Sequence, residues 1–218
     1  MVDQGAREID PQTRDTVRAE VYSLVAGLLA GAPSRDQLAS LAKEGILDLL
    51  RQRMEESGLG DLPELSELTA TMGTTDETSE ALRREFNVLF LGPGKLSAPP
   101  WESVYLSPDR LVMQAPAQEV LREYVDAGLG YDGMIGCPPD HVAKELGFMA
   151  ALIGSAADGN DHGEAARERQ QDFLRRHLLQ WLPRFCGDLE LADTARFYRI
   201  VARLLRSFLN AEECLLCP

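Results

Sequence analysis

The sequence predicts an all-α protein, a single-domain bundle of about ten helices that spans residues 1–218. Apolar residues recur with the spacing of a helix face along most of the chain. No stretch of six or more residues alternates convincingly between apolar and polar, so strands are not expected. No internal repeat or linker-like segment divides the chain, and 218 residues with 44% hydrophobic content are enough for one sizeable core.

Helices account for most of the first ninety residues. Asp10 and Pro11 suit the cap and first position of a helix that ends near residues 31–33. Its apolar stripe is Val17, Val21, Leu24, Val25, Leu28 and Leu29. Shorter helices are expected over residues 34–43 and 46–56, then a turn over 58–63 followed by a brief helix, and a longer helix over 76–90.

Irregular and helical segments alternate in the rest of the chain. Residues 91–108 are rich in proline and glycine and predict an ordered, non-helical path, and 128–139 is a second irregular connection that we expect to act as a hinge. Helices are expected from Pro116 to Gly128 and from Asp140 to about residue 154, followed by a polar loop over 155–163. Two long helices are predicted over 164–182, stopping before Pro183, and over 190–210. Residues 211–218 are expected to be a flexible tail.

The charge balance excludes some classes of partner. The formal net charge is −13, and an acidic surface repels nucleic acid but attracts basic peptides. No apolar run is long enough to cross a membrane, and the polar N-terminus lacks the apolar core of a secretion signal. We therefore expect a cytoplasmic protein whose four cysteines are reduced.

Cys214 and Cys217 have the spacing of half a metal or redox site. A zinc site needs two further ligands, and no second pair with metal-type spacing is present. A metal- or redox-sensing helical protein that uses these two cysteines is the alternative function, and the main interpretation includes no metal or cofactor.

Asp140 and His141 form the pair that most resembles catalytic machinery. A metal-dependent phosphohydrolase needs a histidine before such a pair, but His141 is the first histidine of the chain. His162 falls in the polar loop, and His177 is expected on the charged side of a helix. No nucleophile motif or phosphate-binding loop is present, so we do not expect an enzyme. Asp140 alone is better explained as the N-cap of the helix that it precedes than as a functional residue.

Aromatic residues flank the first irregular segment. Phe86 and Phe90 lie one helical turn apart, a spacing that also fits plain core packing. Trp101 and Tyr105 lie on a stiff, proline-rich stretch, where aromatic side chains form good walls for an apolar groove because they lose little freedom on binding. Glu85 and Asn87 would supply a polar rim.

Two separated motifs resemble the TorD/DmsD family of redox-enzyme maturation chaperones, relatives of the NarJ type. The first motif reads Leu89-Phe90-Leu91-Gly92-Pro93 followed by Pro99-Pro100-Trp101-Glu102-Ser103-Val104-Tyr105-Leu106, and the second reads Cys137-Pro138-Pro139-Asp140-His141. The match extends from about residue 81 to 209 and includes Trp181, Pro183 and Phe197-Tyr198. The family usually has Glu where this chain has Cys137, which shifts recognition of charge to Glu102 and Asp140.

The resemblance implies a cytoplasmic, non-catalytic chaperone. It would bind the twin-arginine signal peptide, and also the mature part, of the catalytic subunit of a molybdopterin-dependent oxidoreductase, and it would assist cofactor insertion before export. Its state would be a monomer that also forms a domain-swapped dimer. The peptide-binding residues carried over to this chain are Phe86, Leu89, Phe90, Trp101, Glu102, Tyr105, Pro139, Asp140 and His141.

Overall fold

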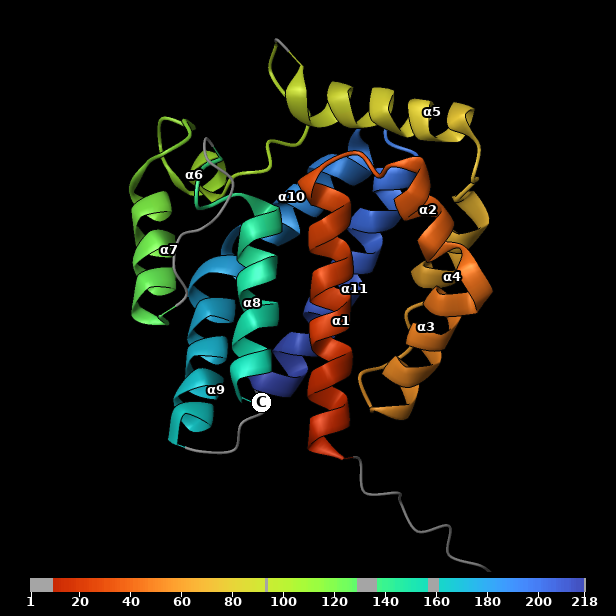
Figure 1. The fold of residues 1–218 in the computed structure, drawn as a ribbon. Coiled ribbons are helices and arrows are strands. Elements are labelled where there is room, and N and C mark those ends of the chain that lie inside the picture. Colours follow the sequence, from red (N-terminus) through yellow and green to blue (C-terminus); the bar gives the residue numbers. More distant parts are fainter. Residues whose placement is uncertain (1–9, 93, 129–136, 157–160, 218) are drawn as a thin grey trace, which may run out of the picture.

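The computed structural model describes residues 10–92, 94–128, 137–156 and 161–217 as an all-helical protein (Figure 1). Its α-helices are α1 Pro11–Ala30, α2 Arg35–Leu41, α3 Ile46–Glu56, α4 Glu64–Thr71, α5 Asp76–Phe86, α6 Glu102–Leu106, α7 Ala115–Asp126, α8 Val142–Ala156, α9 Asp161–Phe173, α10 Leu179–Leu191 and α11 Phe197–Leu216. A short 3-10 turn, η1 Lys43–Gly45, and two π-helical segments, η2 Asn87–Leu91 and η3 Leu174–Leu178, complete the set. These ranges contain no β-strand, which confirms the predicted fold class. No described helix is both long enough and apolar enough to cross a membrane.

Helix α1 lies at the centre of the bundle (Figure 1). The Asp10 carboxylate caps it by accepting from the backbone N–H groups of Gln12 at 3.3 Å and Thr13 at 3.0 Å. Its predicted stripe is buried except for Leu24, which is partly exposed, and the helix packs most extensively against α8. Helix α5 lies across the C-terminal end of α1 (Figure 1).

The predicted break before Pro183 is wrong. Residues 161–191 form one continuous helical run, in which the wider π turn η3 precedes Pro183 by one turn. A proline inside a helix costs roughly 3 kcal/mol. The run continues because Trp181, Leu182, Phe185 and Leu189 are fully buried on both sides of the proline, and each such burial contributes roughly 1.5–3 kcal/mol.

Helix α11 begins later and ends later than predicted, and it replaces most of the expected flexible tail. The Glu85 carboxylate accepts from the backbone N–H groups of Arg196 at 2.8 Å and Tyr198 at 2.9 Å, so it caps the first turn. At the other end, Glu212 is completely buried and forms an ion pair with Arg18 of α1, with 2.6 Å between Oε1 and Nε. Tyr22 also donates a hydrogen bond to Glu212, at 3.0 Å.

The predicted hinge over residues 128–139 lies mostly outside the described residues, since positions 129–136 are not described. Gly128, which follows α7, has a φ of +71°, in the left-handed region that glycine enters without strain. The hinge and the domain organisation therefore stay predictions. Residues 157–160 of the predicted polar loop also lie outside the described part.

Candidate functional site

Backbone hydrogen bonds join the two motifs directly. The N–H of Val142 donates to the carbonyl of Pro100, and the N–H of Glu102 donates to the carbonyl of Asp140, both at 3.0 Å. Trp101 and His141 thereby form an isolated antiparallel β-bridge. The two motifs, which are separate in the sequence, thus lie side by side, and each fixes the backbone of the other.

Asp140 is a helix cap, but not of the helix that it precedes. Its Oδ2 accepts from the backbone N–H of Ser103 at 2.8 Å, which places it at the N-terminus of α6. The Nδ1 atom of His141 instead accepts from the N–H of Ala143, at the start of α8. The expectation that Asp140 caps its own helix is therefore wrong: the carboxylate stabilises the other motif.

A cluster of buried polar side chains lies behind the bridge. Glu102 is 1% exposed and contacts Nδ1 of His177 at 3.0 and 3.1 Å, so His177 is buried rather than on a charged helix face as predicted. Trp181 donates from Nε1 to Glu145 at 3.0 Å. Burial raises the pKa of Glu145 well above its ordinary value, and the charge of Glu102 raises it further. Burial also raises the pKa of Glu102, against the lowering effect of its contact with His177.

A pocket of about 540 Å³ opens on the outer side of the bridge, and we name it the motif pocket. It lies where the C-terminal end of α1 meets α5, η2 and the two motif segments. Its walls are formed by Ala30, Gly31, Ala32, Arg83, Phe86, Asn87, Phe90, Leu91, Pro100, Trp101, Cys137, Pro138 and His141. The rings of Phe86 and Phe90 have centroids 4.9 Å apart, and the rings of Trp101 and His141 stand edge to face at 5.9 Å.

Four of the predicted site residues line this pocket, namely Phe86, Phe90, Trp101 and His141. The others support its walls: Leu89, Glu102, Tyr105, Pro139 and Asp140 are buried and do not line it. Tyr105 instead donates to Asp188 at 3.0 Å, and Tyr124 donates to the carbonyl of Pro139 at 2.9 Å.

The charge of the motif pocket differs from the prediction. Neither Glu102 nor Asp140 reaches it, and Glu85, expected at the rim, caps α11 instead. The charged side chain of the lining is Arg83. Burial, followed by the charge of Lys144, lowers the pKa of His141 to about 4, so this ring is neutral at physiological pH.

Some lining residues were missed from the sequence although a signal was present. Arg83, Asn87 and Leu91 follow one another at four-residue spacing, on the same helical face as Phe86 and Phe90. Asn87 was predicted only as part of a rim. No local sequence pattern predicts that the residues at the end of α1 line the motif pocket, because they do so only where α5 crosses α1.

The two C-terminal cysteines lie on the last turn of α11 and just after it. Cys214 is exposed, and the sulfur of Cys217 accepts from Nε of Arg175 at 3.0 Å. Within the described residues, no three histidine, cysteine or acidic side chains are grouped as metal ligands. The geometry does not favour the alternative function as a metal or redox sensor.

Comparison with known proteins decides the family. A protein-family model described as the nitrate reductase delta subunit matches residues 51–187. The chain belongs to this family of redox-enzyme maturation chaperones. A chaperone protein TorD from Aliivibrio fischeri is 31% identical over 89% of this chain and 92% of its own length. One from Vibrio parahaemolyticus is 29% identical over 91% and 94%.

The family assignment confirms the resemblance that the two motifs carried. A crystal structure from Archaeoglobus fulgidus, assigned to redox enzyme maturation, covers 95% of this chain and 99% of its own, with a TM-score of 0.54 and 21% identity, and supports the fold. The chain is thus a system-specific chaperone for the maturation of a molybdoenzyme. Its relatives carry the name chaperone, which agrees with the expectation of a binding protein.

Proposed function

We propose that the protein is a cytoplasmic, non-catalytic chaperone that holds the twin-arginine signal peptide of its molybdopterin-dependent client in the motif pocket until cofactor insertion is complete. The observation that carries the proposal is the convergence of two distant motifs on one pocket, where their backbones fix each other. A preformed pocket with aromatic walls loses little conformational freedom when it binds an apolar segment.

The lining determines which part of the peptide the pocket takes. Its walls are mainly apolar, and its one charged lining side chain, Arg83, repels a pair of arginines. The apolar body of the signal peptide therefore lies in the pocket, and the arginine pair lies outside it, on the acidic surface of a protein with a net charge of −13. The side-chain amide of Asn87, which is exposed and lines the pocket, is available as a donor for a peptide carbonyl.

Titration with the client's signal peptide tests the proposal. Trp101→Ala and Phe90→Ala each remove an aromatic wall, and loss of such an anchor costs about 2 kcal/mol, or roughly thirtyfold in affinity. Leu191→Ala is the matched control, because Leu191 is 83% exposed at the end of α10 and does not line the pocket. Full affinity in both folded wall variants would place the peptide elsewhere.

A charge variant tests the orientation of the peptide. Arg83→Gln removes the repulsive cation and keeps a side chain of similar length. If the arginine pair lay in the pocket, affinity would rise several-fold at low salt. With the apolar body in the pocket, we expect a change within about twofold that salt does not alter.

A further inference from the structure

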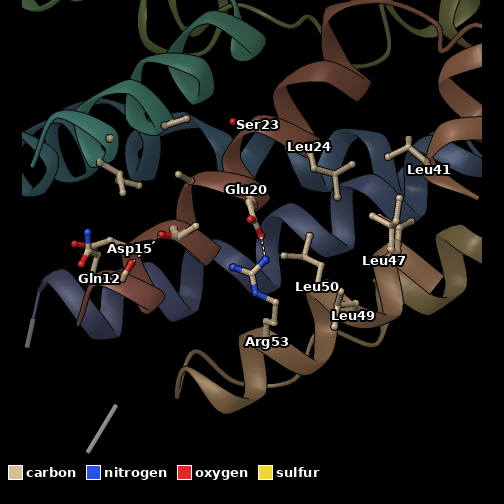
Figure 2. Close-up of a pocket in the computed structure, with 16 residues that line it drawn as sticks. Gln12, Asp15, Glu20, Ser23, Leu24, Leu41, Leu47, Leu49, Leu50 and Arg53 are labelled. Carbon is tan, nitrogen blue, oxygen red and sulfur yellow. Dashed lines mark hydrogen bonds and ion pairs between the residues drawn. The ribbon is translucent and has the colours of Figure 1, made fainter. Parts of the chain in front are cut away.

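A second, longer hollow runs along α1, on the side that faces α2 and α3 (Figure 2). Two adjoining pockets of about 700 and 390 Å³ share Ser23, Leu24 and Leu41, and together form what we name the α1–α3 groove. Its lining on α1 extends from Gln12 to Leu28, which corresponds to about 24 Å at 1.5 Å per residue. That length matches about four turns of a helix.

The groove is mainly apolar, and part of its α3 side is exposed. Figure 2 shows Leu24 of α1 and Leu50 of α3 on facing sides of the hollow. Ile46 and Leu49 on α3 form a lip and leave 47% and 56% of their surface exposed. Neighbouring exposed apolar side chains beside a concave surface are typical of a binding site.

The surface of α1 allows a second helix to approach closely. Ala19, Ser23 and Gly27 are small, line the groove and recur every four residues, so they lie along one face. A Cβ atom added at Gly27 would meet nothing within 4 Å. The open face and the apolar floor fit a helix that inserts side chains at i, i+3, i+4 and i+7.

The charges of the groove select the kind of helix. Its charged lining consists of Asp15, Glu20 and Asp36 against the single cation Arg53. Asp15 already contacts Arg18 at 2.8 Å and Arg167 at 3.7 Å, whereas Glu20 and Arg53 form a half-exposed pair at 2.6 Å across the groove (Figure 2). One basic side chain of the partner can replace Arg53 at Glu20, and another can pair with Asp36. A second copy of this chain, with its own charge of −13, is disfavoured in an acidic groove.

We propose that the α1–α3 groove is a docking site for one amphipathic helix of a partner protein, with an apolar stripe against α1 and arginine or lysine residues on its flanks. The site goes beyond the proposed function: its lining shares no residue with the motif pocket. It gives the protein a second contact with a partner that does not compete with a peptide in the motif pocket.

The test uses a 16-residue amphipathic peptide with a leucine stripe and lysine flanks, titrated into the full-length protein. A peptide of the same composition with the leucines scrambled is the ligand control. Gly27→Leu fills the groove and should weaken binding by on the order of tenfold or more. Gly147→Leu is the matched protein control, because Gly147 also lies within a helix, has open space at its Cβ and lines none of the described pockets.

Two charge variants separate docking from a merely structural ion pair. Glu20→Gln should weaken the basic peptide about threefold at low salt, whereas Arg53→Gln should tighten it about twofold, although both break the same pair. Equal effects of the two variants, or equal binding of the scrambled peptide, would overturn the proposal. So would unchanged binding to folded Gly27→Leu.

Two further outcomes are separated by the same variants. A concentration-dependent dimer that Gly27→Leu abolishes would make a second copy the occupant and overturn the assignment of the partner. Signal-peptide binding that is lost in Trp101→Ala and kept in Gly27→Leu would support the independence of the two sites. The reverse pattern would overturn both assignments, since the signal peptide would then occupy the groove.

Discussion

Replacement of Asp140 distinguishes a cap that holds the two motifs together from a carboxylate that contacts peptide. Asp140 is completely buried, and its Oδ2 accepts from the N–H of Ser103 at 2.8 Å. Asp140→Ala leaves this buried N–H without its acceptor, and such a loss costs about 2 kcal/mol. For a chain of this length, each kcal/mol lowers the melting temperature by roughly 2–4 °C, so we expect a shift of about 4–8 °C.

Asp140→Asn has a different expected result. The amide oxygen of asparagine can accept the same hydrogen bond, and asparagine caps helices about as well as aspartate. The substitution also removes a negative charge that raises the pKa values of Glu102 and Glu145. We therefore expect the free energy of unfolding to stay within about 1 kcal/mol of the wild-type value.

Melting curves and urea titrations of both variants, beside signal-peptide titrations at low and high salt, provide the assay. If the carboxylate only supports the wall, Asp140→Asn binds peptide normally at every salt concentration. A salt-dependent loss of affinity in a fully stable Asp140→Asn protein would refute this reasoning and restore direct charge recognition. Equal destabilisation by asparagine and alanine would refute the cap.

Three further predictions concern the rest of the molecule. Glu212→Ala removes the buried carboxylate that pairs with Arg18 and leaves Asp15 as its remaining acidic partner, so it should cost about 3 kcal/mol in urea unfolding. Glu213→Ala, on the exposed side of the same turn, should change little, and equal, small losses would mean that the tail is flexible after all. Folding lowers the pKa of His141 from 6.5 to about 4, so the folded protein favours the neutral ring. The free energy of unfolding should therefore be unaffected by this group above pH 6.5 and should fall as the pH drops from 6.5 towards 4. At about 1.4 kcal/mol per unit of pKa shift, the loss amounts to roughly 3 kcal/mol. His141→Asn keeps an acceptor for the N–H of Ala143 and should flatten that part of the stability curve, and an unchanged slope would assign it to other groups. Light scattering should find a monomer with a minor, domain-swapped dimer, and an obligate tetramer would contradict the hinge.

Helices with regularly spaced apolar residues were predictable because that spacing, within the segment itself, indicates which face is buried. The stripe from Val17 to Leu29, apart from the partly exposed Leu24, and the face of α8 are buried as expected. Where prediction failed, a distant partner decided the outcome. Helix α11 starts at Phe197 because Glu85 caps it, and it continues past Asn210 because Glu212 meets Arg18. Neither partner is visible from within the C-terminal sequence.

The site was predictable in its aromatic part and not in its polar part. Phe86, Phe90 and Trp101 line the pocket because large apolar side chains beside a stiff turn pack against one another and are kept from solvent. A carboxylate has more options: Glu102 pairs with His177, and Asp140 caps α6. Sequence alone cannot separate a carboxylate that faces a ligand from one that satisfies a buried donor, since both fit the same residue type.

The buried cluster explains how an apolar pocket can keep its shape. Buried polar groups that lose their partners cost more than they contribute when paired, so the arrangement that satisfies them is strongly preferred over alternatives. Glu102 and Asp140 each connect a motif segment to a second element, η3 in one case and α6 in the other. The segments that carry Trp101 and His141 are thereby fixed by buried groups that do not line the motif pocket. If the signal peptide binds in the motif pocket as proposed, its affinity comes from the aromatic lining, and the buried polar groups behind the lining preserve the shape of the pocket. Wall variants should then change binding, whereas Asp140→Ala should first change stability.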